Sequence, residues 1–70
     1  MKKQTITIEH GNESIYANGY KGFINIMVCK DGKIRDGIAK TVDQINSISE
    51  RISDTKNRDA FLVWAKKVIE

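Results

Sequence analysis

Two side chains in this sequence, His10 and Cys29, are the single histidine and the single cysteine of the chain. A cysteine–histidine dyad would need both side chains at the same end of adjacent strands. His10 falls in a predicted turn and Cys29 in a predicted buried strand, and no nearby group in the sequence would activate the thiol. We therefore predict a protein that is not an enzyme, with Cys29 in the core and His10 at the surface.

The sequence predicts no metal site and no cofactor. A lone cysteine excludes a disulfide within the chain and a cysteine-rich zinc site. Residues 30–37, KDGKIRDG, lack the evenly spaced acidic ligands of a calcium loop. Gly19 and Gly22 form a G-x-x-G pattern, but the nucleic-acid-clamping loop with that pattern joins two helices. Here the pattern lies between predicted strands, so turn geometry accounts for both glycines.

Basic side chains gather around one predicted hairpin turn, and an aromatic–basic pair precedes it. The first 40 residues hold seven Lys and Arg against four Asp and Glu, whereas the last 30 are balanced at five each. Such clustering favours an acidic partner, either nucleic acid or protein. Asp31 and Asp36 dilute the field, and no known nucleic-acid-binding signature occurs. The candidate partner-binding residues are Tyr20, Lys21, Lys30, Lys33 and Arg35.

Four short segments have the alternation of β-strands. Thr5 to Glu9 alternates polar and apolar side chains, which predicts a half-buried strand. Ser14 to Ala17 is a second strand, which we expect to end at the Asn18–Gly19 turn signal. Residues 23–29 form a third strand. Asp31–Gly32 predicts a tight hairpin turn into a fourth strand, residues 33–39, that Gly37 bends or ends.

After Thr41 the apolar spacing becomes helical. Thr41 and Gln44 form a capping box, and Val42, Ile45, Ile48 and Ile52 follow on one helical face. A second helix then begins, capped by Thr55 or Asn57. Its predicted apolar face consists of Phe61, Leu62, Trp64, Ala65, Val68 and Ile69, with Val63 on the outside.

This order predicts an α+β fold: an antiparallel sheet of three to four strands, followed by two C-terminal helices packed on it. Residues 1–70 make one small domain. The strand at 23–29 is apolar on both faces, with Phe23, Met27 and Cys29 on the second face. Either the helices straddle the sheet and cover both faces, or one face remains open to a partner.

We expect a small interaction module, a regulator or inhibitor that binds a larger protein or pairs as a homodimer. The alternative is a basic nucleic-acid-binding protein that uses the hairpin at 30–35. No apolar stretch follows Lys2 and Lys3 as it would in a secretory leader, and no segment is long enough to cross a membrane, so a cytoplasmic location is expected. Eleven isoleucines beside one leucine are typical of A/T-rich genes, which are common in phages and mobile elements.

Overall fold

Four consecutive segments of alternating side chains form one antiparallel sheet, and two helices follow it. The computed structural model describes residues 2–70. Adjacent strands in the sequence are adjacent in the sheet, in the order β1-β2-β3-β4. The elements are β1 (Gln4–His10), β2 (Glu13–Tyr20), β3 (Phe23–Lys30), β4 (Lys33–Ala39), α1 (Val42–Ser49) and α2 (Thr55–Ile69). The predicted α+β fold, with both helices C-terminal to the sheet, is confirmed.

The hairpin turn between β3 and β4 lies where the sequence predicts it. Asp31 and Gly32 both have positive φ, at 52° and 77°. Two successive positive φ angles belong to the tight turn that matches the twist of a hairpin, and Asp–Gly is a favoured pair there. Lys30 and Lys33 therefore pair directly across the end of the hairpin.

One predicted strand end is wrong, and a glycine is the reason. Asn18 and Gly19 lie inside β2, with Gly19 paired to Ile24 of β3. A Cβ on Gly19 would overlap the Phe23 carbonyl oxygen and lie 2.8 Å from Ile24 Cδ1. Gly19 thus allows two strands to approach closely and does not form a turn. The fourth strand spans residues 33–39 as predicted, and Gly37 lies within it without ending it.

Thr41 caps α1 as predicted, whereas Gln44 reaches back to Lys40 and not to Thr41 itself. The Gln44 backbone N–H donates to Thr41 Oγ1 at 3.2 Å, while Gln44 Oε1 accepts from the backbone N–H of Lys40 at 2.7 Å. The helix ends at Ser49, so Ile52 lies in the connecting loop although it is fully buried. Val42, predicted on the apolar face, is exposed.

The N-cap of α2 is Asp54, and the predicted caps Thr55 and Asn57 are wrong. Asp54 has extended backbone angles, and its side chain accepts the Asn57 backbone N–H at 3.0 Å. The apolar face is as predicted: its residues are buried or partly buried, and Val63 is exposed. At the C-terminal end, the Gly22 N–H donates to the Ile69 carbonyl at 3.0 Å, which ties α2 to the turn between β2 and β3.

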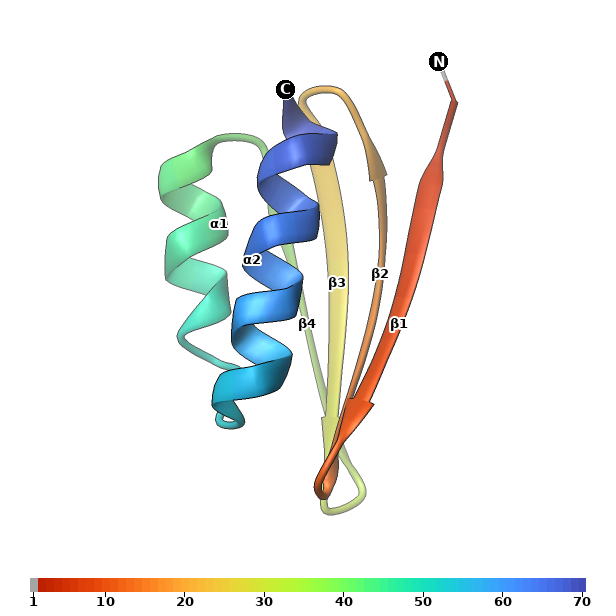
Figure 1. The fold of residues 1–70 in the computed structure, drawn as a ribbon, viewed down its shortest axis with the longest axis vertical. Coiled ribbons are helices and arrows are strands. Elements are labelled where there is room, and N and C mark those ends of the chain that lie inside the picture. The colour runs from red at the N-terminus through yellow and green to blue at the C-terminus, as the bar shows by residue number, and fades with distance from the viewer. Residues whose placement is uncertain (1) are drawn as a thin grey trace.

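Both helices pack on the same face of the sheet (Figure 1). The arrangement in which they straddle the sheet is wrong. Only residues 50–54 connect the helices, and so short a connection keeps them antiparallel neighbours on one face. The core lies between sheet and helices and contains Ile15, Ala17, Ile24, Ile26, Val28, Ala39, Ile45, Ile48, Ile52, Phe61, Ala65, Val68 and Ile69.

Candidate functional site

The sheet has a second face, turned away from the helices, which we call the open face. Strand alternation and register place every second residue on it. These residues are Thr5, Thr7, Glu9, Ser14, Tyr16, Asn18, Tyr20, Phe23, Asn25, Met27, Cys29, Ile34, Asp36 and Ile38. Figure 1 shows no element of the chain lying over this side of the sheet.

Large apolar side chains of the open face are exposed to solvent. Ile34 and Ile38 on β4 are 62% and 55% exposed, and Met27 on β3 is 41% exposed. Tyr16 pairs with Met27 across the strands and is 44% exposed. Five of the seven large exposed hydrophobic residues in the described chain belong to this face: Tyr16, Tyr20, Met27, Ile34 and Ile38.

Tyr20 anchors one end of this apolar surface. Its ring stacks on that of Phe23, with centroids 5.5 Å apart and planes 20° from parallel. Tyr20 and Phe23 are paired residues beside the turn between β2 and β3. Such a stacked pair is a favourable contact that restrains both rings at this end of the open face.

The charged residues of the open face are acidic. Glu9 lies on β1 and Asp36 on β4, and no lysine or arginine occupies an outward position of the four described strands. The basic residues of β4, Lys33 and Arg35, are on the inner side. The open face therefore combines exposed apolar area with a weak negative charge.

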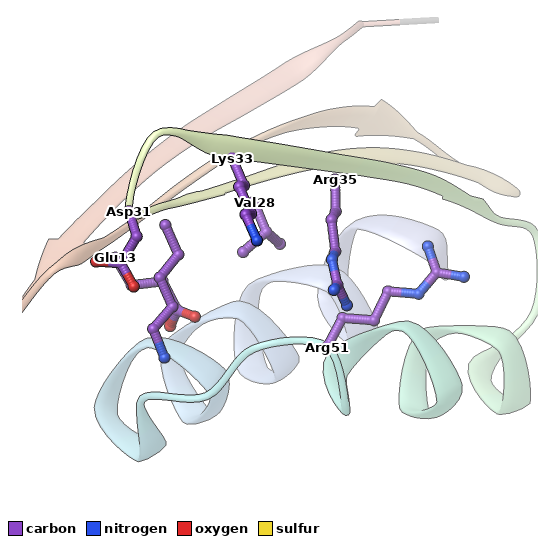
Figure 2. Close-up of a pocket in the computed structure, with 7 residues that line it drawn as sticks. Glu13, Val28, Asp31, Lys33, Arg35 and Arg51 are labelled. Atoms are coloured by element: carbon purple, nitrogen blue, oxygen red, sulfur yellow. The ribbon is translucent and has the colours of Figure 1, made fainter.

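A second feature, which we call the basic pocket, lies on the inner side near the Asp31–Gly32 turn. Its volume is about 160 Å³. Figure 2 shows Lys33 and Arg35 pointing from the strand toward the helix layer. The lining residues are Glu13, Val28, Lys30, Asp31, Lys33, Arg35 and Arg51.

The pocket exists because α1 is too short to cover β4. Eight helical residues span about 12 Å, whereas the seven residues of β4 span about 23 Å. The half of β4 nearest the hairpin turn is therefore left without a helix over it. Lys33 and Arg35 occupy that half and are exposed, while Ala39 at the covered end is buried.

No cation of the pocket lies within 4.0 Å of a carboxylate oxygen in the described residues. Within residues 2–70 the sole ion pair closer than 4.0 Å joins His10 and Asp54. Arg51 is the one lining cation with a hydrogen bond, from Nη1 to the Asp36 carbonyl oxygen at 3.0 Å. Four positive and two negative side chains thus line one concave surface, which leaves an excess of positive charge.

Glu13 forms the inner wall of the pocket and fastens the loop between the helices to β2. It is 3% exposed. Its carboxylate accepts the backbone N–H groups of Ser53 at 2.9 Å and Asp54 at 3.1 Å. The Asn57 side-chain amide donates to it as well, at 3.2 Å.

These contacts determine the protonation of Glu13. Burial alone would raise the pKa of Glu13, but the hydrogen bonds, together with the positive charge of Lys30, lower it below its ordinary value. Glu13 is therefore ionised at neutral pH, and the loop donors already occupy both of its oxygens.

His10 and Cys29 do not form the dyad considered from the sequence. His10 is on the inner side, where Nδ1 contacts Asp54 Oδ2 at 2.7 Å. Cys29 is on the open face, paired with Ser14 and Ile34, and it is partly buried. Hydrogen bonds lower the pKa of Asp54, first from the Asn57 backbone N–H and then from His10.

The structure brings together three of the five candidate partner-binding residues. Lys30, Lys33 and Arg35 all line the basic pocket. Tyr20 and Lys21 lie at the opposite end of β3, about 25 Å away along the strand. Tyr20 belongs to the open face, so the five residues do not form one surface.

Sequence reasoning did not single out four of the seven residues that line the basic pocket, namely Glu13, Val28, Asp31 and Arg51, or part of the open face. Arg51 and Glu13 approach the hairpin from other elements, which no local pattern reveals. The sequence did contain a signal that Ile34 and Ile38 share one face of a strand, because they alternate with charged and small residues along β4.

Within residues 2–70, no three His, Cys, Asp or Glu side chains come together as metal ligands. No helix in that range has the length and apolar character required to span a membrane. No protein-family model, curated protein or solved structure matches this chain.

Proposed function

We propose that this chain is a small non-enzymatic interaction module, a regulator or inhibitor, that binds a larger protein through its open face. One observation supports the proposal most directly: Ile34, Ile38 and Met27 are widely exposed on a sheet face that no helix covers. Several large apolar side chains exposed on one face are characteristic of interaction sites, whereas single exposed hydrophobic residues are common everywhere.

The charge of the open face favours a different protein over a second copy of this chain. Two copies packed face to face would bring together Glu9 and Asp36 of each, with no cation on either face to compensate. Pairing of two β4 edges centred on Asp36 would place the two Asp36 side chains directly opposite each other, which is unfavourable. A partner with an apolar patch flanked by lysine or arginine would be complementary.

Such a module would act by covering the surface that it binds. With one sheet face in contact with the partner, the helix layer would point outward and block access to the covered site. A cytoplasmic setting remains our expectation, and a phage or mobile-element origin would fit a small regulator of this composition.

Affinity capture with matched variants tests the proposal. The tagged protein, a Met27→Lys variant and a Val63→Lys variant are each incubated with lysate of the source organism. Both substitutions place lysine at an exposed apolar position, at the centre of the open face and on the outer side of α2 respectively. Met27 lies directly opposite Asp36, so a lysine there has a favourable cross-strand neighbour and the sheet is kept.

The expected result is a protein retained by the wild type and by Val63→Lys but lost with Met27→Lys. A charge placed at the centre of a desolvated interface removes a large part of the binding energy, as at hot spots elsewhere. Circular dichroism first establishes that both variants are folded. Equal retention by the two variants would contradict docking through the open face.

Nucleic-acid binding by the hairpin at 30–35 is the second candidate. The observation that favours it is the group of cations without ion-pair partners in the basic pocket. Fluorescence anisotropy with labelled DNA and RNA at low salt is the measurement. Binding whose logarithmic affinity falls steeply with the logarithm of salt concentration would support it, and a flat signal would exclude it.

A further inference from the structure

The basic pocket lies on the helix side of the sheet, away from the open face, and docking of a protein on the open face leaves it unoccupied. We propose that this pocket binds a single phosphate group, free or as the end group of a small molecule. Lys30, Lys33, Arg35 and Arg51 supply the donors. The proposal does not depend on the open face, because it involves other residues on the other side of the sheet.

Size limits the ligand to one small group. A pocket of about 160 Å³ is well below the roughly 300–1,000 Å³ that holds a drug-sized ligand. At about 30 Å³ per water molecule it has room for about five waters, which is the scale of one oxyanion. A whole nucleoside would not fit, so the remainder of a larger ligand would project into solvent.

The kind and number of donors favour phosphate over carboxylate. Two arginines, whose guanidinium groups are planar forks of N–H donors, and two lysines line the same pocket. A phosphate dianion carries up to two negative charges and three strong acceptor oxygens, whereas a carboxylate carries one charge and two oxygens. The Arg51 guanidinium lies beyond Arg35 from Lys33 (Figure 2), where Nη1 donates to the Asp36 carbonyl oxygen, so it would contribute to a ligand from the Arg35 side with its other N–H groups.

The two carboxylates of the pocket restrict the site to one anion. Glu13 forms the inner wall, with both oxygens occupied by donors from the loop and α2. Asp31 lies on the hairpin turn and repels any anion beyond the four cations. A nucleic-acid strand would need cations in succession, but the next lysines of the sheet, Lys21 and Lys40, lie at its far end.

Titration with inorganic phosphate, followed by the protein's amide NMR signals at constant ionic strength, tests the proposal. We expect saturable shifts centred on residues 30–35 and on Arg51, and none when chloride replaces phosphate. Lys33→Gln should weaken binding about tenfold, the usual cost of one charge-assisted hydrogen bond. Lys40→Gln removes the same charge at the other end of β4 and should leave the affinity unchanged.

Three results would overturn the proposal. A response to phosphate no larger than the response to chloride would mean general screening, and so would equal weakening in Lys33→Gln and Lys40→Gln. The third result comes from a parallel titration with a single-stranded oligonucleotide. If it binds far more tightly than phosphate and also shifts the signals of Lys21 and Lys40, the surface is one for nucleic acid and not for a single phosphate.

Discussion

Glu13 is a buried carboxylate whose role is to hold the chain together between β2 and the loop that follows α1. Three donors from Ser53, Asp54 and Asn57 converge on it. A buried acceptor with so many donors cannot be removed without leaving those donors unpaired. In the sequence Glu13 stands beside turn residues and looks like a surface glutamate, so its role is visible only after folding.

At this residue we predict that Glu13→Gln lowers the free energy of unfolding by about 2 kcal/mol, because hydrogen bonds to a charged acceptor contribute more than neutral ones. Urea unfolding of the variant and the wild type provides the measurement. Glu9→Gln makes the same change on the open face and should cost less than about 0.5 kcal/mol. Similar losses in both variants would remove the special role assigned to Glu13.

Acid should destabilise the protein by protonating the carboxylates of Glu13 and Asp54. The pKa values of Glu13 and Asp54 are both lowered in the folded chain. A lowered pKa means that the unfolded chain binds more protons, so the stabilisation is complete above the ordinary carboxyl range, about pH 4. It is lost as the pH falls through the lowered values.

Urea unfolding from neutral to acidic pH measures this effect. The wild type should lose stability on acidification, and Glu13→Gln should show a shallower decline because one of the two titrating groups is gone. Parallel pH dependence in the two proteins would be inconsistent with ionised Glu13 as the anchor.

Among the elements, glycine-containing pairs show what local sequence can and cannot determine. Asp31–Gly32 needs only its own φ angles to make the β3–β4 turn, so its prediction from sequence succeeded. Asn18–Gly19 has the same local preference but lies within β2, because Gly19 is required where Phe23 and Ile24 approach closely. That requirement comes from the neighbouring strand, which a local reading does not include.

Gly19→Ala should therefore destabilise the sheet by about 1–3 kcal/mol, the usual cost of forcing an extra methyl group into a packed site. The Cβ would meet backbone of β3, which cannot move aside without breaking the ladder. Gly37→Ala is the matched control on β4, where the nearest atom is Arg51 Nη1 at 3.3 Å, the end of a flexible side chain.

Thermal unfolding of these two variants is the measurement. Gly19→Ala should melt at a clearly lower temperature than the wild type, and Gly37→Ala should remain close to it. Equal melting temperatures for all three proteins would show that the close approach at Gly19 is not a constraint on the sheet.

For the whole molecule, the sequence predicts the order of elements but not the side of the sheet on which each helix packs. The strand at 23–29 is apolar on both faces, which fits either arrangement. The choice depends on the short connection at 50–54 and on the packing of α1 against α2. Because both helices share one face, the apolar residues on the other face remain exposed, and they are the basis of the proposed docking role.

The isolated protein should be monomeric, because the acidic open face does not complement itself. Sedimentation equilibrium at micromolar concentration should give the mass of one chain, at both low and moderate salt. A dimer that dissociates in Met27→Lys would mean that a second copy, and not a larger protein, covers the open face.

Methyl NMR of the protein bound to its captured partner tests the central claim most directly. Binding should shift or broaden the methyl signals of Met27, Ile34 and Ile38 on the open face and leave those of Ile24, Ile45 and Ile52 in the core nearly unchanged. Unchanged signals for the three open-face residues, in a complex that is demonstrably formed, would contradict the account.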